Sequence, residues 1–463
     1  MVQTRKLFGT DGVRGKANVL PMTPEMALRL GRAITHVARR DGRKSPRVII
    51  GKDTRLSCYM FEQAIAAGIC AQGGRVMLSG PIPTPAVANL TSSMRADAGI
   101  VISASHNPFE DNGIKIFGRD GFKLPDAQEL ELEALLESDT IDHGPTGAAI
   151  GSAVRLDDAQ GRYIVYAKST FPHDLTLNGM KIVVDAANGA AYKVAPSIFA
   201  ELGAEVIALG IQPNGTNINK RCGALHPEAM QREVIKRKAD LGICLDGDAD
   251  RVILVDEQGD IVDGDAVMAL CATHLLQEKR LKKKTLVSTV MSNMGLEVAM
   301  KRAGGKLLRT GVGDRYVVEA MRKHKLNLGG EQSGHLVFLE HATTGDGCVA
   351  ALQILAIMAR EHRPMSELAQ VMEPIPQVLI SSTFSQRLPL DEMPRLNKEI
   401  KAAEAKLKGD GRVLVRWSGT EPKLRLMAEG PDPKKLTTWL NRMSAAAEKD
   451  IQAEKGRSAK SKS

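Results

Sequence analysis

Short apolar runs rich in valine and isoleucine recur along the chain, and segments with helical periodicity separate them. Between the runs, stretches such as 24–40 and 190–202 place apolar residues at helical spacing. Strands that alternate with helices predict layered α/β domains with mixed or parallel sheets. The runs that we expect to form strands are 47–51, 75–78, 98–102, 181–185, 205–209, 241–245 and 284–288.

The order of elements changes near the end of the chain. From about Pro374 the pattern predicts a strand, a helix, another strand and a last helix from Pro433, which indicates a smaller α+β domain. A weak internal repeat supports several domains: 96–117 and 239–255 both begin Ala-Asp-x-Gly-Ile, and 326–339 has the same outline. We therefore expect three similar mixed-sheet α/β domains and a smaller C-terminal domain. The expected boundaries are 1–155, 156–257, 258–372 and 373–452, with a disordered basic tail at 453–463.

Composition restricts the class of protein. The chain has 463 residues, of which 43% are hydrophobic, and no apolar stretch approaches the ~20 residues of a membrane span, so we expect a cytoplasmic protein without a membrane partner. The 6 cysteines form no CxxC pair and are predicted to be reduced core residues. The net charge of +9 permits a polyanion partner, which remains an alternative. Only 3% of residues are aromatic, however, so we expect small phosphorylated substrates rather than a nucleic acid.

Three aspartates alternate with small residues after the predicted strand 241–245. Asp246, Asp248 and Asp250 can turn their oxygens toward one hard cation. A calcium EF-hand loop is the nearest alternative, but Arg251 replaces its obligatory glycine and both flanks are strands. A solvated acidic turn would not need three packed carboxylates. The pattern predicts a divalent site suited to Mg²⁺.

Two further loops carry polar residues among glycines. Residues 416–422, RWSGTEP, follow one strand and precede another, and they offer hydroxyls, N–H groups and arginines that could hold a phosphate. Residues 329–335, GGEQSGH, combine a carboxylate, a hydroxyl and an imidazole, which suit sugar hydroxyls. Read alone, the first loop is equally compatible with a turn bearing exposed arginines, and the second with a glycine-rich hairpin. Near the N-terminus, FGTDGVRG at 8–15 could present Arg14 to an anion.

The strand at 98–102 ends in SASHNP, residues 103–108. Pro108 and Asn107 force a turn, which can hold up the hydroxyl of Ser105. No GxSxG elbow is present, and His106 at a strand end should point away from its neighbour, so a hydrolase triad is disfavoured. Phosphoryl transfer needs an exposed hydroxyl, a metal, cations and a base, and Lys115 lies on the strand that we expect to pair back.

Together the loops resemble those of the α-D-phosphohexomutase family. Its active serine lies in SASHNP or TASHNP, its metal loop is DGDxDR, its sugar loop GExSGH and its phosphate loop a relative of R-x-SGTEP. All four occur here in the family order, between about Lys6 and Gly430. FGTDGVRG, the glutamine of GEQSGH, TTGDG at 343–347 and GVGDRYV at 311–317 resemble the bacterial branch that acts on amino-sugar phosphates. Trp417 departs from the pattern and leaves the packing of its loop open.

The resemblance implies an enzyme with four domains around a central cleft. Ser105 would carry a phosphoryl group and bind one Mg²⁺ per active site with Asp246, Asp248 and Asp250. Lys115 would act as general base or acid, with a pKa lowered by neighbouring arginines. The remaining implied catalytic residues are Arg14, Arg251 and His106, and the implied substrate-binding residues are Glu331, Ser333, His335, Arg416, Ser418, Gly419, Thr420 and Arg425.

The implied reaction interconverts glucosamine 6-phosphate and glucosamine 1-phosphate through a bound glucosamine 1,6-bisphosphate, which also serves as activator. Its product would supply amino-sugar nucleotide and cell-wall precursor synthesis. Activity on glucose or mannose phosphates is the alternative within the family. The implied assembly is a monomer or a homodimer that takes a small phosphosugar as its only partner.

Overall fold

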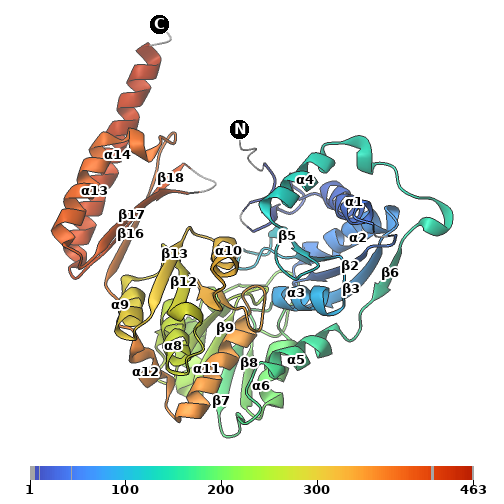
Figure 1. Cartoon of the computed structure of the whole chain (residues 1–463), viewed down its shortest axis with the longest axis horizontal. Coiled ribbons are helices and arrows are strands. Elements are labelled where there is room, and N and C mark those ends of the chain that lie inside the picture. The colour runs from blue at the N-terminus through green and yellow to red at the C-terminus, as the bar shows by residue number, and fades with distance from the viewer. Residues whose placement is uncertain (1–5, 10, 43, 419–421, 461–463) are drawn as a thin grey trace. The chain divides into compact units, whose positions relative to one another are not determined.

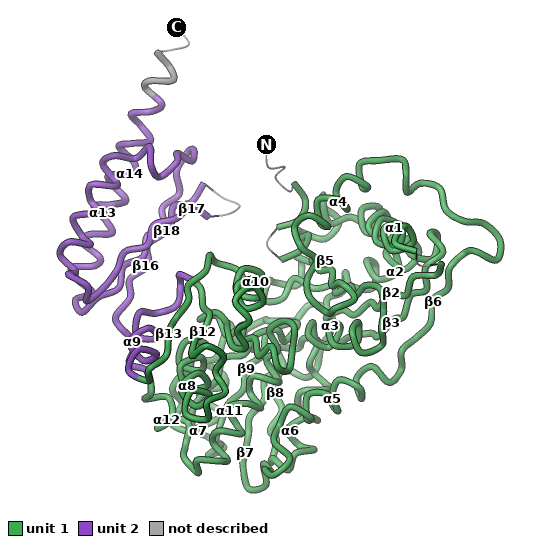
Figure 2. The backbone as a smooth tube through the Cα atoms, viewed as in Figure 1, with its two compact units in different colours: residues 1–289, 303–371 green, residues 290–302, 372–463 purple. Residues whose placement is uncertain are grey.

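A computed structural model describes residues 6–9, 11–42, 44–418 and 422–460 of the chain. They form two compact units, which Figure 2 shows in different colours. The first unit comprises residues 1–289 and 303–371, and the second comprises 290–302 and 372–463. The first unit contains three sheets and the second contains one (Figure 1).

The first sheet of the first unit has six strands in the order β1-β5-β4-β2-β3-β6. Strand β2 is parallel to β3 and β4, whereas β5 returns antiparallel to β4. Apolar side chains from the sheet and from helices α1, α2 and α4 form one continuous core. The elements are β1 Val13–Lys16, α1 Pro24–Arg40, β2 Arg47–Lys52, α2 Leu56–Ala71, β3 Arg75–Pro81, α3 Thr84–Ser93, β4 Ala98–Ile102, β5 Asp111–Gly118, α4 Asp126–Leu136 and β6 Ser152–Arg155.

The second sheet has the order β11-β10-β9-β7-β8 and the third has the order β13-β12-β14-β15. In both sheets an antiparallel hairpin follows parallel strands, namely β9–β10 and β14–β15. The second sheet uses α5 Ala159–Ser169, β7 Lys181–Asp185, α6 Val194–Glu201, β8 Glu205–Leu209, α7 Glu228–Arg237, β9 Leu241–Leu245, β10 Val252–Asp256 and β11 Ile261–Val262. The third uses α8 Gly264–Gln277, β12 Thr285–Thr289, β13 Lys306–Thr310, α10 Asp314–His324, β14 Leu328–Gly330, β15 Leu336–Phe338, α11 Gly347–Glu361 and α12 Met365–Leu368.

The second unit is an antiparallel sheet with the strand order β16-β18-β17. Helices α13 and α14 pack together and share an apolar core with the sheet. A helix from earlier in the chain, α9, belongs to the same unit. The elements are α9 Met294–Arg302, β16 Gln377–Thr383, α13 Pro394–Leu407, β17 Arg412–Trp417, β18 Lys423–Glu429 and α14 Pro433–Lys460.

The predicted fold class, three α/β domains and a smaller C-terminal α+β domain, is confirmed. Two local predictions differ from the structure. The helix expected over 190–202 begins only at Val194, because Ala190 N–H donates 2.8 Å to Gly247 O and holds the preceding residues in a turn. The second sheet also extends past residue 257, since β11 pairs with β10.

The basic end of the chain is helical where we expected disorder. Helix α14 continues through Lys460, so the prediction of a disordered tail is wrong for 453–460, while 461–463 lie outside the described residues. Leu440, Met443 and Ile451 anchor the helix in the core. Once that nucleus exists, helix formers such as Ala453, Glu454 and Lys455 extend it at little cost. Within the described ranges, no helix combines the length and the apolar character that a membrane crossing requires.

Candidate active site

The SASHNP turn follows β4, and its backbone turns sharply at Ser105. Ser105 has φ +52°, in the left-handed region that a non-glycine residue adopts only at a cost. Ser105 N–H donates 2.9 Å to Ser103 Oγ, and Ser105 Oγ donates 2.5 Å to Asp246 Oδ2. The hydroxyl therefore meets the aspartate loop across 141 residues of sequence. Ser105 is fully buried, so a substrate needs some opening of the structure to reach Oγ.

His106 lies beside the serine hydroxyl, contrary to the expectation that it points away. Its Nδ1 is 3.3 Å from Ser105 Oγ, because the left-handed residue breaks the alternation of side chains that a strand would impose. Burial, together with the charges of Arg251 and Arg14, lowers the pKa of His106 to about 4. The imidazole is therefore neutral at physiological pH and can accept a hydrogen bond.

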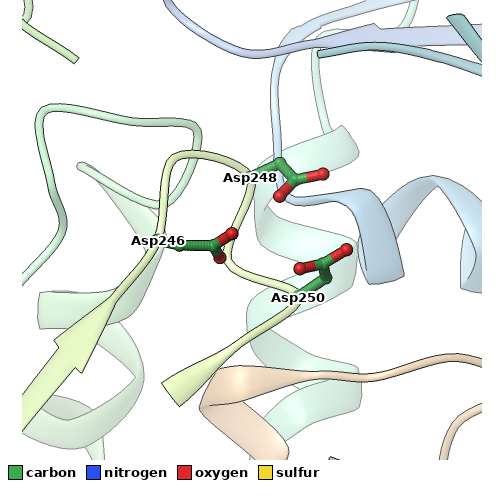
Figure 3. A group of neighbouring side chains, drawn as sticks. All are labelled: Asp246, Asp248 and Asp250. Atoms are coloured by element: carbon green, nitrogen blue, oxygen red, sulfur yellow. The ribbon is translucent and has the colours of Figure 1, made fainter. Parts of the chain in front are cut away.

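The three aspartates project from the loop between β9 and β10, as Figure 3 shows. One carboxylate oxygen from each of Asp246, Asp248 and Asp250 lies within 4.8 Å of the others, and all three residues are buried. Burial and the charges of Asp250 and Asp248 raise the pKa of Asp246. At an effective dielectric constant of about 20, each pair at this separation repels by roughly 3 to 4 kcal/mol.

The aspartate loop fits a small divalent cation. Asp248 Oδ1 and Asp250 Oδ1 are buried and accept no hydrogen bond from any described residue. Buried carboxylate oxygens normally accept hydrogen bonds, so two oxygens without one in the same cluster favour a metal ligand role. Hard oxygen donors in this number suit Mg²⁺. Thr84 at the start of α3 fixes the loop, since its Oγ1 donates 2.5 Å to Asp248 Oδ2.

Lys115 on β5 contacts the same carboxylates. Its Nζ is 2.9 Å from Asp248 Oδ2, 3.1 Å from Asp250 Oδ2 and 3.2 Å from Asp11 Oδ2. Burial of the ammonium lowers its pKa, but the three carboxylates raise it by more, so the pKa lies well above its ordinary value. The expectation of a lowered pKa is wrong for this arrangement, because carboxylates surround Lys115 more closely than arginines do.

Arg14 lies on β1 rather than in a glycine-rich loop, and it pairs with Asp11. Burial lowers the pKa of Arg14, but Asp11, Asp248 and Asp250 raise it by more. Arg251 follows the aspartates, and its Nε is 3.8 Å from Asp250 Oδ1. Burial and its acidic neighbours act on its pKa in the same opposing way, with a net rise. Both guanidinium groups therefore keep their charge beside the metal loop.

The β14–β15 hairpin brings the predicted sugar-binding residues to this cluster. His335 Nδ1 is 3.7 Å from Asp250 Oδ1, and its Nε2 is 3.3 Å from Asp314 Oδ2. Burial lowers the pKa of His335, but these two carboxylates raise it by more. Glu331 Oε1 accepts 3.1 Å from Gly313 N–H, and burial raises the pKa of Glu331. Ser333 is exposed at the tip of the turn.

The predicted phosphate-binding residues belong to the second unit. Arg416 on β17 and Arg425 on β18 are direct cross-strand partners, and both are half-buried. Burial and the charge of Arg425 lower the pKa of Arg416, whose buried Nε finds no hydrogen-bond partner among the described residues. Two like charges placed opposite each other repel, and an anion between them removes that repulsion. Ser418 is buried beside them, whereas Gly419 and Thr420 lie outside the described residues.

Trp417, the departure from the family pattern, packs into the core of the second unit. Its Nε1 donates 2.8 Å to Leu388 O, and its ring meets Phe384 edge-on with centroids 6.0 Å apart. Because neighbouring residues on a strand face opposite sides, this packing leaves Arg416 on the other face.

Sequence reasoning missed several residues that complete the cluster. Asp11 contacts Lys115, Arg14 and Lys123, and Lys123 Nζ also donates 2.5 Å to Asp314 Oδ2. Asp11 and Asp314 occur within the motifs FGTDGVRG and GVGDRYV, but neither residue was singled out from the sequence. Lys123 has no local pattern that would distinguish it from a surface lysine.

This fold, with its serine turn, aspartate loop and glycine-rich hairpin, defines an enzyme of the phosphohexomutase class. The chain belongs to the phosphoglucomutase/phosphomannomutase family. Models of the family's alpha/beta/alpha domains I, II and III match residues 5–142, 162–259 and 263–375, and the model of its C-terminal domain matches 379–446.

Bacterial relatives match almost the whole chain. A phosphoglucosamine mutase from Sorangium cellulosum is 64% identical over 449 residues, covering 96% of this chain and 94% of its own length. A protein of the same name from Myxococcus xanthus is 59% identical and covers 97% of this chain and 98% of its own length.

Solved structures share the fold. A phosphoglucomutase/phosphomannomutase family protein from Burkholderia thailandensis has a TM-score of 0.80 at 25% identity, covering 96% of this chain and 97% of its own. An N-acetylphosphoglucosamine mutase from Aspergillus fumigatus, solved with GlcNAc-6P and magnesium, has a TM-score of 0.67 at 18% identity and covers 96% of each chain.

Proposed function

We propose that this chain is a phosphoglucosamine mutase that interconverts glucosamine 6-phosphate and glucosamine 1-phosphate. The observation that carries the proposal is the meeting of Ser105 Oγ and the aspartate loop, 2.5 Å apart, with the buried Lys115 and the partly buried Arg14 and Arg251 close to the same carboxylates. That arrangement suits reversible phosphorylation of a serine. The bacterial relatives named phosphoglucosamine mutase, at 58 to 64% identity, support glucosamine as the sugar.

In this proposal Ser105 alternates between hydroxyl and phosphoserine. The phosphoserine gives its phosphoryl group to the free hydroxyl of the bound sugar phosphate, with Lys115 as general acid or base. The bond from phosphorus to the sugar oxygen forms, the bond to Ser105 Oγ breaks, and the hydroxyl proton replaces the phosphoryl group on Ser105, which yields glucosamine 1,6-bisphosphate. After the bisphosphate turns around, Ser105 Oγ attacks its other phosphoryl group and releases the isomer. Arg14, Lys115 and Arg251 neutralise charge on the transferring group. Because the single proton of the free serine hydroxyl is donated to Asp246, a neutral His106 can donate from Nδ1–H to Ser105 Oγ.

The other loops hold the parts of the substrate that do not react. Glu331, Ser333 and His335 bind sugar hydroxyls, and Arg416, Ser418, Gly419, Thr420 and Arg425 bind the second phosphate. The half-buried pair of arginines with an unpartnered Nε supports this assignment. Few rigid side chains would then contact the sugar, which suits a ligand that must bind in two orientations.

Asp246, Asp248, Asp250 and Ser105 would hold one Mg²⁺ per site. When bound, the cation supplies positive charge that stabilises the transferring phosphoryl group. The Oδ1 atoms of Asp248 and Asp250, which accept no hydrogen bond from the described residues, support this ligand set. The Aspergillus enzyme was solved with magnesium, and a variant of that enzyme was solved with glucose 1,6-bisphosphate.

We also propose a cytoplasmic location, a monomer or homodimer, and a role in supplying precursors of amino-sugar nucleotides and cell wall. The proposed domain boundaries lie near residues 155 and 372 and, in place of residue 257, just after β11. A nucleic acid is not part of the proposal.

Side-by-side rates test the substrate. We expect kcat/KM to be highest for glucosamine 1-phosphate when the 1-phosphates of glucosamine, glucose and mannose are compared with the same enzyme. Ser105→Ala should lower kcat by at least about 1,000-fold while the protein stays folded. Intact-mass analysis after incubation with glucose 1,6-bisphosphate should show one added phosphoryl group, absent from Ser105→Ala. A clear preference for a neutral sugar would assign the chain to the phosphoglucomutase/phosphomannomutase activity instead.

A further inference from the structure

The backbone conformation of the SASHNP turn is unfavourable without contacts to other parts of the protein. Ser105 adopts φ +52°. The left-handed conformation costs a non-glycine residue about 1 to 2 kcal/mol, and it persists only where contacts with the surroundings impose it. The turn also directs several carbonyl oxygens into the protein interior, where each needs a donor. Something outside the turn must therefore supply both the donors and the constraint.

Arg55 supplies most of those donors. Its side chain is fully buried, and all five N–H groups of its guanidinium are engaged. Nη2 donates 2.9 Å to Ser105 O and 2.9 Å to Asn107 O. Nη1 donates to Pro108 O and, at 3.1 Å, to Asp111 O. One planar group thus binds main-chain oxygens on both sides of the turn.

Asp53 fixes the guanidinium and the turn at the same time. Its Oδ2 accepts 2.8 Å from Arg55 Nε and 2.6 Å from Ser103 Oγ, and Ser103 Oγ in turn accepts from Ser105 N–H. Asp53 and Arg55 are both shielded from solvent, so the ion pair does not relax into water. The chain of contacts runs from β2 through Asp53 to both the N–H and the carbonyl oxygen of Ser105.

A second donor arrives from a different part of the first unit. Asn219 Nδ2 donates 2.8 Å to Ser105 O and 3.2 Å to Asn107 O. The same Ser105 oxygen lies 2.5 Å from the point where a Cβ on Gly247 would stand, so only glycine permits the metal loop to approach. The carbonyl oxygen of Ser105 is therefore the point at which three segments converge.

We infer that Arg55, assisted by Asn219, is a positioning residue that sets the direction of Ser105 Oγ for phosphoryl transfer. Its hydrogen bonds reach Asp53 and main-chain oxygens, not Ser105 Oγ or the metal-loop residues Asp246, Asp248 and Asp250, so it acts through the main chain of Ser105. The inference rests on the proposed phosphoserine function. A lysine retains the charge but not the planar fork, so Arg55→Lys holds fewer of these oxygens and lets the turn drift. A misplacement of about 1 Å at a reacting atom costs on the order of 100-fold in rate.

Single-turnover phosphorylation of Ser105 tests the inference. Unphosphorylated enzyme is mixed with glucose 1,6-bisphosphate, and intact mass is followed over time. For Arg55→Lys we expect the phosphoryl-transfer rate to fall about 10- to 100-fold, while almost every molecule still becomes phosphorylated in the end. A role in stability alone would instead leave the rate unchanged and reduce the fraction of molecules that react. Mg²⁺ affinity, measured by calorimetry, should change less than threefold, because the aspartates are intact.

Two further variants keep the test decisive. Asn219→Gly removes the assisting amide, and glycine accepts the left-handed backbone of Asn219 (φ +58°), so this variant should fold and lose roughly 3- to 10-fold in rate. Arg29→Lys is the matched control: Arg29 binds Leu136 O at 3.1 Å and Ser138 O at 2.8 Å in the same way, far from Ser105 in sequence. Its rate should equal that of the wild type.

The outcomes distinguish failure of the proposed function from failure of the positioning role of Arg55. If the wild type itself takes up no phosphoryl group on Ser105, the proposed function fails. If the wild type reacts and both Arg55→Lys and Asn219→Gly react at the wild-type rate, the proposed function stands and the positioning role is overturned.

Discussion

At the scale of single residues, the neighbours of the aspartate loop donate hydrogen bonds to only some of its carboxylate oxygens. Asp248 has one oxygen bound by Thr84 and Lys115 and the other free. We predict that Asp248→Asn weakens Mg²⁺ binding at least about 10-fold, because affinity at such sites follows the number of charged ligands. Calorimetric titration of the purified protein with Mg²⁺ measures this directly.

Asp260→Asn is the control for that experiment. Asp260 is exposed and follows β10 of the same hairpin, so its loss of charge should leave the titration unchanged. An unaltered titration in Asp248→Asn would remove Asp248 from the ligand set.

Short motifs indicate which segments belong to the candidate site, but they do not predict the surroundings of each side chain. Ser105 and the three aspartates, which the structure brings together, could be singled out because a hydroxyl on a turn and alternating carboxylates form local patterns. The raised pKa of Lys115 could not be found in this way, because it depends on Asp11 and on aspartates 133 and 135 residues away. The position of His106 was predicted wrongly because a left-handed backbone at a serine has no sequence pattern of its own.

At the scale of elements, helix α11 begins on a buried carboxylate. Asp346 Oδ1 accepts 3.0 Å from Val349 N–H and 2.9 Å from Tyr163 Oη–H. Burial raises the pKa of Asp346 to about 6, although these hydrogen bonds act in the opposite direction. An unfolded chain has a carboxyl pKa near 3.9 at this residue. Between about pH 4 and 6 the folded state therefore binds more protons, and this group's contribution to stability falls as pH rises.

We predict that Asp346→Asn removes this dependence. The amide oxygen can still cap the helix, but nothing at this position ionises. Relative to the wild type, the variant should gain stability as pH rises from 4 to 6, by at most about 3 kcal/mol, and keep that gain above pH 6. Urea unfolding at several pH values measures the difference. Asp346→Ala, which loses the cap, should cost about 1 kcal/mol even at pH 4; a difference between Asn and wild type that is constant with pH would contradict the prediction.

Several helices and strands were predicted well where the apolar pattern was clear. The helix at 24–40 and the strands at 98–102, 181–185, 205–209 and 241–245 coincide with the predicted ranges. The ends of elements were predicted wrongly where a distant contact determines them, as at Ala190, whose N–H donates to Gly247 O. The helical end of α14 was not predicted, because local helix propensity takes effect only once packing has started the helix.

At the scale of the whole molecule, the second unit is built from two separate stretches of chain. Arg412 donates 2.9 Å to Val290 O and 2.5 Å to Ser292 O, and Asn293 exchanges two hydrogen bonds with Ile375. Met294 N–H also donates to Glu429, a buried carboxylate. Sequence analysis placed 290–302 with its neighbours in the third α/β domain, because no local pattern in that stretch indicates these partners.

We predict that if the chain is cut after Glu373, the two fragments remain bound to each other. An inserted protease site at this exposed position would separate 374–463 covalently, but the contacts to 290–302 should keep the small fragment attached. Gel filtration after complete cleavage should show both fragments in one peak. Asn293→Ala, which removes two of the contacts, should make the small fragment dissociate at lower urea concentrations. Immediate separation of the wild-type fragments would contradict the prediction.

The same two-part construction has a consequence for synthesis on the ribosome. Ser292 emerges 120 residues before Arg412, its partner in the second unit. The core of that unit also needs Leu440, Met443 and Ile451, close to the end of the chain. Helix α9 therefore lacks its partner surface until these later residues have been synthesised. Because exposed intermediates of large proteins aggregate, truncated products of this chain should need chaperones more than the complete chain does.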